Sequence, residues 1–422
     1  MQETLIQLAQ EEAQNYSSPI VAAKINGEVR DIQSEYNHDD EISFIELNTA
    51  LGWRIYQRSV LFLFIVAVSN MNKEAEVVAK FTVNKGLYCE VKIPGQSINL
   101  RFIQDIEQEM RGMIANNVPI LKHGIPRQEA IELFQTRGNR GKAALISSLP
   151  HPMISIYTCC NYPDYLYGAM LPETKLLGQF ALDVEQSGVL IRTPDEMTDG
   201  KIRTRVEQPK FGHILSEAKE WARILECPYI SDLNQINTEH RMGELIRVSE
   251  ALQEKRIGQI ADHIASHRNN IRLILIAGPS SSGKTSFAQR LRIQLRVNGL
   301  HPIMISLDDY FLNREDTPRN EKGQYDYESI DAIDTALFNR NMLELLNGHR
   351  VQIPYYNFIT GKREWHDDNF LLMKEDQPII IEGIHGLNER LTADIARKNK
   401  YKIYISALTQ LNIDAHNRIP TT

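Results

Sequence analysis

Four short apolar segments recur along the last third of the chain, separated by loops and by stretches with helical spacing. They cover residues 272–277, 302–307, 378–381 and 401–405. Because their apolar runs are nearly continuous, they have the pattern of strands buried on both faces of a parallel sheet. Strand, loop and helix following one another in this order predict an α/β domain with helices on both faces of the sheet.

The first half of the chain mixes strand-like and helix-like spacing and is predicted to be α+β. Segments 20–25 and 28–32 flank Asn26-Gly27, a pair that supplies the positive φ angles of a tight hairpin turn. The other elements predicted from apolar spacing are a mostly buried helix over 51–69, amphipathic helices over 98–116 and 126–136, and short strands within 80–94 and 153–191.

Residues 211–268 have helical spacing and are predicted to connect these two regions. One apolar stripe runs from Ile214 to Leu225, and a second runs from Leu245 to Ile264. No helix-breaking residue stands between Met242 and Gly258, so this part is predicted to be one long helix.

Bulk composition narrows the class of protein. The 422 residues are 42% hydrophobic and 24% charged, and the formal net charge of −7 argues against a general affinity for nucleic acid. The four cysteines have no Cys-x-x-Cys spacing, so neither a disulfide framework nor a zinc site is predicted. The N-terminus lacks the apolar core of a signal peptide, and the apolar run over 60–68 is shorter than the roughly 20 residues of a membrane-spanning helix. A cytoplasmic protein without membrane contact is expected.

The strongest chemical signal is the stretch GPSSSGKT over 278–285, which fits the phosphate-loop pattern G-x-x-x-x-G-K-[ST]. Its glycines let backbone N–H groups surround phosphate oxygens, and the helix that follows adds partial positive charge at its N-terminus. Lys284 is predicted to hold the β- and γ-phosphates of ATP, and the Thr285 hydroxyl is predicted to bind Mg²⁺. The residues predicted to bind ATP are Gly278, Pro279, Ser280, Ser281, Ser282, Gly283, Lys284, Thr285 and Ser286.

Carboxylates follow two of the predicted strands, at the sheet edge where ligands bind in open α/β sheets. Asp308 and Asp309 follow the second strand, and Glu382 follows the third. Phosphoryl transfer to a hydroxyl group needs one carboxylate to take a proton and another to help hold Mg²⁺. Asp308 is the predicted base and Glu382 the predicted metal-shell residue, whereas a capping role stays open for Asp309.

From Ile271 onward the chain resembles the uridine kinase family, which is grouped with phosphoribulokinase and pantothenate kinase. The resemblance rests on six stretches in the family order, namely IAGPSSSGKTSFAQRL, SLDDYF, GQYDYESIDAID, VQIPYYNF, IIIEGIHGLN and ISALTQLNIDAHNRIPTT. It implies ATP-dependent phosphorylation of a nucleoside, with Asp308 acting on the ribose 5′-hydroxyl. It also implies that Tyr310 or Phe311, together with Glu328 and Tyr356, surrounds the nucleoside.

The chain departs from this family in two respects. Members place a histidine that contacts the base five residues after the position of Tyr356, where this chain has Gly361. Without the hydrogen-bond donor of that histidine, the preferred nucleobase stays open. An anionic phosphate acceptor, which Lys362 and Arg363 would contact, also stays open. Members also carry phosphate-clamping arginines after the stretch that matches 412–422, so the kinase-like domain is expected to be incomplete at its C-terminal end.

Residues 20–200 resemble the TGS domain and the second additional domain of threonyl-tRNA synthetase. The resemblance rests on KINGEVRDI, GLYCEV, QDIEQEMRGMI, PRQEAIELF and LLGQFALDVEQSGVLIRTP. The synthetase domain uses a His-x-x-x-His helix with a later Cys and His, whereas residues 58–62 here read RSVLF, so no deacylation is expected. The expected domains are a TGS-like part over 1–60, an α+β part over 61–210, the helical connector over 211–268 and the kinase-like domain over 269–422.

Three functions stay open at this point. The first is ATP-dependent phosphorylation of a uridine- or cytidine-like nucleoside. The second keeps the kinase but takes a sugar phosphate or another small alcohol as the acceptor. The third is a nucleotide-sensing regulator that contacts RNA through its N-terminal region. A small-molecule substrate is the expected partner, and an oligomer is compatible with all three functions.

Overall fold

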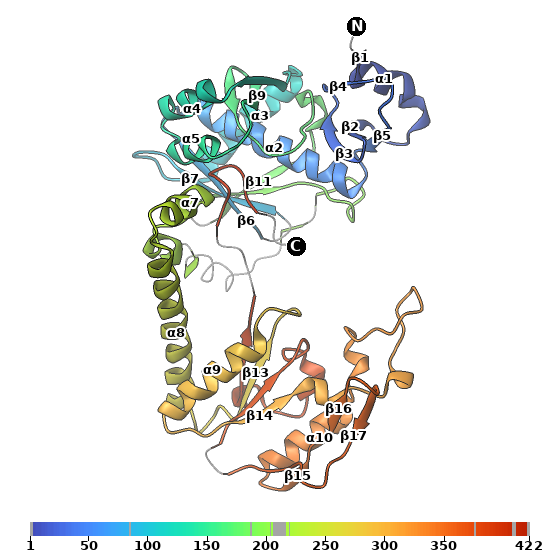
Figure 1. Cartoon of the computed structure of the whole chain (residues 1–422), viewed down its shortest axis with the longest axis vertical. Helices are drawn as coiled ribbons and strands as arrows, with labels where there is room; N and C mark the ends of the chain where they lie inside the picture. The colour runs from blue at the N-terminus through green and yellow to red at the C-terminus, as the bar shows by residue number, and fades with distance from the viewer. Residues whose placement is uncertain are drawn as a thin grey trace. The chain divides into compact units, whose positions relative to one another are not determined.

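The computed structural model describes residues 3–83, 86–185, 188–202, 204–205, 217–218, 220–374, 377–406 and 411–419. The chain divides into two compact units, drawn in Figure 1. The N-terminal unit comprises Met1–Met242 and Thr409–Thr422, and the C-terminal unit comprises Gly243–Leu408. The end of the predicted domain over 269–422 therefore belongs to the N-terminal unit, whereas the finer boundaries at 60, 210 and 268 stay predictions.

The N-terminal unit begins with a small antiparallel sheet. In spatial order its strands are β3 (Glu28–Asp31), β2 (Ile20–Ile25) and β5 (Ile42–Glu46). The predicted hairpin is confirmed, because Asn26 and Gly27 form its turn with φ angles of 51° and 84°. Helix α1 (Leu5–Glu12) packs on this sheet through its buried apolar residues.

Helix α2 (Ala50–Met71) forms the core of the N-terminal unit, as predicted for 51–69. The Thr49 hydroxyl accepts the N–H of Gly52 and caps the first turn. Every side chain from Ser59 to Val68 is buried. The helix is long and apolar enough to cross a membrane, but 72% of its most apolar window is buried within the unit, as in the core helix of a globular domain.

The described part of this unit also contains an antiparallel pair of β1 (Glu3–Thr4) and β4 (Glu35–Tyr36), two larger antiparallel sheets and several helices. One sheet has the order β11 (Ala181–Glu185), β12 (Gly188–Arg192), β7 (Gly86–Lys92) and β6 (Glu76–Val83). The other contains β8 (Leu121–Pro126), β9 (Met153–Cys159) and β10 (Tyr162–Asp164). The helices are α3 (Leu100–Ala115), α4 (Arg127–Thr136), α5 (Arg140–Ser147) and α7 (Ile230–Thr238). The amphipathic helices predicted over 98–116 and 126–136 are confirmed by α3 and α4.

The C-terminal unit is built on a four-stranded parallel sheet, which confirms the α/β prediction for this region. In spatial order its strands are β14 (Ile303–Ser306), β19 (Ile379–Glu382), β13 (Leu273–Ala277) and β20 (Lys400–Tyr404). Each strand overlaps one of the four predicted apolar segments. Because all neighbouring pairs are parallel, the C-terminal ends of the four strands meet at one edge.

Helices and short hairpins surround this sheet. The helices are α8 (Met242–Ser266), α9 (Lys284–Val297) and α10 (Thr335–Leu346), and α8 confirms the long helix predicted after Met242. The short pairs are β15 (Arg350–Gln352) with β18 (Phe370–Leu372) and β16 (Tyr355–Asn357) with β17 (Lys362–Glu364). Ile214, the start of the other predicted helical stripe, lies outside the described residues.

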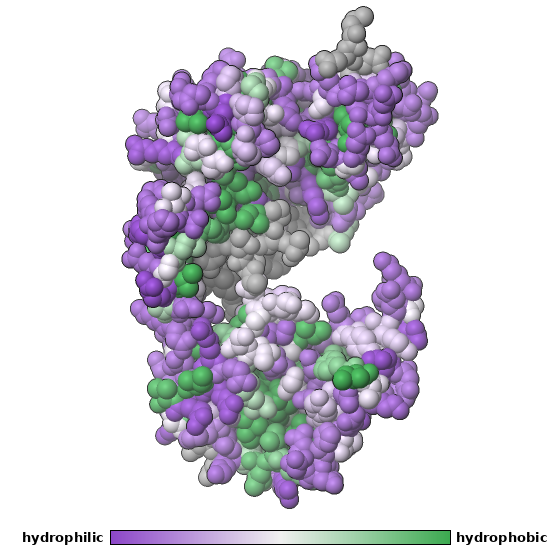
Figure 2. All heavy atoms as spheres, viewed as in Figure 1, coloured by the Kyte–Doolittle hydropathy of each residue, from purple (hydrophilic) through white to green (hydrophobic). Residues whose placement is uncertain are grey.

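Successive residues of β13 face two different helical layers. Leu273 and Leu275 share a buried cluster with α10, whereas Ile274 and Ile276 share another with α8 and α9. This burial on both faces explains why the strand is apolar throughout. Figure 2 shows the outer surface. The drawn face of each unit is covered mainly by hydrophilic residues, with scattered apolar patches.

Candidate active site

The phosphate-loop sequence forms the turn between β13 and α9. Gly283 precedes the first residue of α9 and has a φ of 85°, a region that favours glycine. Gly278 allows a close backbone approach, since a Cβ there would lie 2.3 Å from the carbonyl oxygen of Ile405. The Oγ of Ser282 is buried and has no hydrogen-bond partner among the described residues. An unpaired hydroxyl beside a helix N-terminus fits a phosphate oxygen of ATP.

Replacing Gly278 by alanine is expected to weaken the binding of an ATP analogue about tenfold, because overpacking against a fixed backbone atom costs roughly 1–3 kcal/mol. Fluorescence titration with a labelled ATP analogue measures this change. Gly258→Ala is the matched control, since the nearest atom to a Cβ there is Gln294 Oε1 at 3.8 Å. Unchanged affinity in the Gly278 variant would contradict the predicted nucleotide site.

Thr285 and Glu382 meet at the edge of the parallel sheet. The Thr285 hydroxyl donates to Glu382 Oε1 at 3.1 Å. Glu382 is the last residue of β19, where it pairs in register with Ile276 of β13 and Ser306 of β14. Hydroxyl and carboxylate oxygens are the hard ligands that Mg²⁺ prefers. The two residues predicted to bind Mg²⁺ are therefore adjacent and fit that ion.

Asp308 follows β14 directly, in a 3₁₀ turn over Leu307–Tyr310. Burial raises the pKa of Asp308, and the ammonium group of Lys284 opposes that rise. Burial also raises the pKa of Glu382, the hydrogen bond from Thr285 lowers it, and the charge of Asp308 raises it again. The charge of Lys284 thus affects the pKa values of both Asp308 and Glu382, so these three residues interact electrostatically. The Lys284 ammonium itself donates to the carbonyl oxygen of Pro279 at 2.9 Å.

Asp309 joins this carboxylate group to the next part of the site. Burial raises its pKa, the backbone N–H of Tyr356 lowers it, and the charges of Asp308 and Glu382 raise it further. Asp309 Oδ1 accepts that N–H at 3.4 Å. The charges of these carboxylates oppose one another, but among the described residues no group of three or more His, Cys, Asp or Glu side chains is arranged to hold a metal ion.

An aromatic cluster lies next to these carboxylates and consists of Phe311, Tyr327, Tyr356 and Phe358. The ring of Phe311 is edge-on to those of Tyr327 and Tyr356, with centroids 5.8 and 5.5 Å apart. Tyr356 is likewise edge-on to Phe358 at 5.0 Å. The backbone N–H of Tyr356 donates to Asp309. The aromatic cluster therefore contacts the residue that follows Asp308, the predicted base. Phe311 and Tyr356 are buried, whereas Phe358 is 61% exposed, so the ring of Phe358 is the one that a planar group of an acceptor could reach.

Three of the predicted substrate residues do not belong to the aromatic cluster. Tyr310 is fully buried, and its hydroxyl accepts a hydrogen bond from Asn341 at 3.2 Å. Phe311 is buried as well and shares the same hydrophobic core cluster, so burial does not choose between the two residues. Arg363 forms an ion pair with Asp334 at 2.9 Å, which already balances its charge. Glu328 is exposed.

His385 is a residue of this region that sequence reasoning missed. Its Nε2 is buried and has no hydrogen-bond partner among the described residues. Burial lowers the pKa of His385, while bonds to the backbone of Glu328 and Ser329 raise it. The available signal was its place in the stretch IIIEGIHGLN, directly after Glu382-Gly-Ile.

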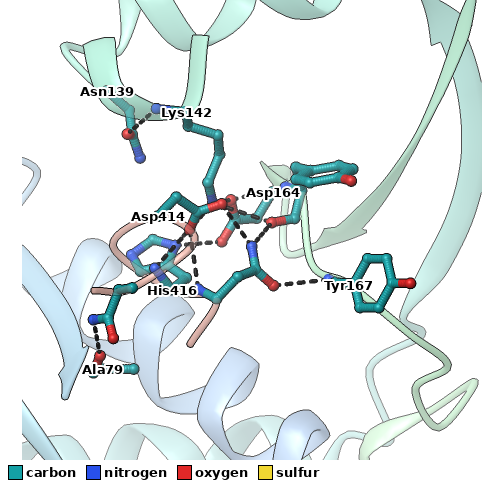
Figure 3. Close-up of polar contacts among 10 residues, drawn as sticks. Ala79, Asn139, Lys142, Asp164, Tyr167, Asp414 and His416 are labelled. Atoms are coloured by element: carbon teal, nitrogen blue, oxygen red, sulfur yellow. Dashed lines mark hydrogen bonds and ion pairs between the residues drawn. The ribbon is translucent and has the colours of Figure 1, made fainter. Parts of the chain in front are cut away.

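A second polar group, in the N-terminal unit, joins residues from distant parts of the sequence (Figure 3). We call Lys142, Asp164, Asp414 and His416 the buried ion cluster. Lys142 forms an ion pair with Asp164, and its Nζ lies 3.2 Å from His416 Nδ1 and 3.7 Å from Asp414 Oδ1. His416 Nδ1 is 2.6 Å from Asp164 Oδ2. Burial alone would raise the pKa of Asp164, but Lys142 and His416 more than offset this and lower it.

The segment over 411–419 carries two members of the buried ion cluster and is bonded to the rest of the N-terminal unit. Asn412 Nδ2 donates to the carbonyl oxygen of Ala79 at 2.7 Å, and Asn417 Oδ1 accepts the N–H of Tyr167 at 2.8 Å. Ala415 and His416 line a cavity of about 930 Å³ in this unit. No sequence pattern predicts this arrangement, because more than 250 residues separate Asp164 from His416.

Comparison with known proteins identifies the C-terminal region. Residues 273–419 match the model of the Phosphoribulokinase / Uridine kinase family, so this third of the chain is a P-loop kinase domain. A solved structure of a possible uridine kinase from Bacillus stearothermophilus is 22% identical, with a TM-score of 0.30 over 36% of this chain and 81% of that chain. D-glycerate 3-kinase from Cryptococcus neoformans var. grubii is 19% identical, with a TM-score of 0.23 over 31% of this chain and 52% of that chain.

The N-terminal region is similar to threonine–tRNA ligases. The enzyme of Acidithiobacillus ferrooxidans is 26% identical over 163 residues, which are 38% of this chain and 25% of that protein. The enzyme of Francisella tularensis subsp. novicida is 28% identical over 162 residues, again 38% and 25%. The chain thus spans about a quarter of the length of these ligases. Both resemblances predicted from the sequence are confirmed.

Proposed function

We propose that this protein phosphorylates the 5′-hydroxyl of a nucleoside, using MgATP. One observation carries the proposal: Asp308 shares the edge of the sheet with Lys284, and the aromatic cluster lies one residue further on. A carboxylate beside a phosphate-binding lysine suits proton removal from an alcohol. Aromatic faces next to that carboxylate suit an acceptor that carries a flat base.

Each residue has a separate task in this proposal. Lys284 and the phosphate loop hold the triphosphate and neutralise charge, while Thr285 and Glu382 hold Mg²⁺. MgATP, when bound, supplies the phosphoryl group. Asp308 accepts the proton of the attacking hydroxyl, and the burial that raises its pKa makes it a stronger base than an exposed aspartate.

An acceptor panel with the full chain tests the proposal. ADP release is followed with MgATP and uridine, cytidine, adenosine, guanosine or a sugar phosphate, and phosphorus NMR identifies the product. A nucleoside 5′-monophosphate is the expected product. Turnover of the sugar phosphate without turnover of any nucleoside would refute the proposal in favour of the second candidate.

The likeness of the N-terminal region to threonine–tRNA ligases supports another candidate, a regulator that contacts RNA. The same panel separates this candidate from a nucleoside kinase. Absence of turnover with every acceptor, together with tRNA binding that weakens as salt is raised, would favour the regulator.

A further inference from the structure

The cavity of about 930 Å³ in the N-terminal unit is lined by charged groups from two places in particular. Arg137 and Arg140 lie where α4 ends and α5 begins. Lys73, Glu74 and Glu76 lie where α2 ends and β6 begins. A cavity of this volume is large enough for a drug-sized ligand. Its lining residues belong to the N-terminal unit, so it is not part of the candidate active site.

The two arginines of this lining keep their charge available. In the described part of the chain, neither guanidinium has a carboxylate within ion-pair distance. The Arg137 guanidinium lies over the ring of Tyr162, with its Cζ 4.7 Å from the ring centroid. Both arginine side chains are exposed, so their N–H donors remain open to an anion that enters the cavity.

Helix α5 begins at the same place and adds partial positive charge through its first turn. Lys142, from that turn, reaches Asp164 and His416 in the buried ion cluster (Figure 3). His416 lines the cavity and is only 7% exposed. Its Nδ1 is bonded within the cluster, whereas no hydrogen-bond partner of its Nε2 is found among the described residues. A largely buried nitrogen without a partner in a cavity lining indicates a polar group of a ligand.

The carboxylates of the lining are of two kinds. Asp164 is paired with Lys142, so its charge is balanced. Glu74 and Glu76 have no cationic partner in the part of the chain that the structure describes. An ionised carboxylate only accepts hydrogen bonds, so these two groups suit the hydroxyl groups of a ligand and repel its anionic end. The lining therefore favours a ligand that is anionic at one end and bears hydroxyl groups at the other.

We propose that this cavity binds a small phosphate monoester that also carries hydroxyl groups, the chemistry shared by nucleoside monophosphates and sugar phosphates. Its phosphate group lies against Arg137, Arg140 and the first turn of α5, because guanidinium groups and helix N-termini both bind phosphate oxygens. The hydroxyl groups of the ester donate to Glu74 and Glu76. The proposal is independent of the proposed kinase activity, since it involves the N-terminal unit alone.

Cys160 provides a local probe, because it lines the same cavity and is exposed, whereas Cys89, Cys159 and Cys227 are buried. The rate at which iodoacetamide alkylates Cys160 in the full chain is measured by mass spectrometry. Cytidine 5′-monophosphate, ribose 5-phosphate, inorganic phosphate and cytidine are the probes. At least one of the two esters is expected to slow alkylation severalfold, at a lower concentration than inorganic phosphate. Cytidine, which lacks the phosphate group, leaves the rate unchanged.

Replacing both Arg137 and Arg140 by glutamine is expected to raise the ester concentration needed for half-maximal protection at least about tenfold, the scale of losing one charge-assisted hydrogen bond. The matched control carries Arg54→Gln and Arg101→Gln, which remove two exposed arginines of the same unit that do not line the cavity. It leaves protection unchanged. Equal protection in the two double variants, protection by inorganic phosphate alone or by tRNA alone, or no protection by either ester would overturn the proposal.

Discussion

Asp308→Asn is expected to lower the turnover number of the kinase about 10²- to 10⁴-fold, the usual contribution of a general base. Asparagine has nearly the same shape as aspartate but cannot take the proton of the acceptor hydroxyl. Asp308 lies outside the phosphate loop, so the affinity for an ATP analogue is expected to stay close to that of the wild type. Single-turnover measurements with the best acceptor of the panel separate loss of chemistry from loss of binding.

The control for this experiment is Asp367→Asn, which removes an exposed carboxylate from the same unit. It is expected to leave turnover unchanged. If Asp308→Asn turned over as fast as the wild type, another group would have to accept the proton. Asp309, whose pKa is likewise raised by burial, would be the next residue to test.

Lys142→Met is expected to destabilise the N-terminal unit by about 3–5 kcal/mol, the cost of removing one partner from a buried ion pair. Methionine has a similar length, so the main change is the loss of charge. Asp164 and Asp414, which are 1% and 0% exposed, would then lose the positive charge with which both are paired. Because two members of the buried ion cluster lie on the segment over 411–419, hydrogen exchange in this segment should also accelerate.

Trp53 provides a local probe for this experiment, since it lies next to Tyr56 of the core helix α2, with ring centroids 5.3 Å apart. Replacing Trp221 and Trp365 by phenylalanine leaves Trp53 as the sole tryptophan. Its fluorescence then reports the denaturant unfolding of the N-terminal unit separately from that of the C-terminal unit. Arg30→Met, which breaks an exposed ion pair with Glu28, is the control and should cost at most about 1 kcal/mol. A similarly small loss in Lys142→Met would show that the buried ion cluster does not hold the segment in place.

These two experiments address different parts of the chain. The Asp308 variant tests the chemistry of the C-terminal unit, whereas the Lys142 variant tests what fixes the segment that follows β20 in the sequence. In the C-terminal unit, the carbonyl oxygen of Ile405 is the close neighbour of Gly278 in the phosphate loop.

Most features that could be predicted from the sequence follow from short local patterns of residues. The four strands of the parallel sheet follow from apolar runs, because strands buried on both faces admit few polar residues. The Asn26-Gly27 hairpin follows from backbone conformation, and the phosphate loop follows from glycines placed between a strand and a helix. The carboxylates at the strand ends were found because parallel strands bring their C-terminal ends to one edge.

Only the tertiary structure decided how residues distant in sequence meet. Apolar spacing cannot show that His416 reaches Asp164, because an ion pair of this kind leaves no periodic pattern. It also cannot show that the ring of Tyr310 packs against Phe338 while the ring of its neighbour Phe311 packs against Tyr327 and Tyr356, since both are aromatic and adjacent in sequence. The space beside Gly361 is a third case, because the guanidinium of Arg314, from another loop, occupies it. The sequence by itself thus determined the helices, the strands and the phosphate loop. Tertiary packing decided which side chains share a site.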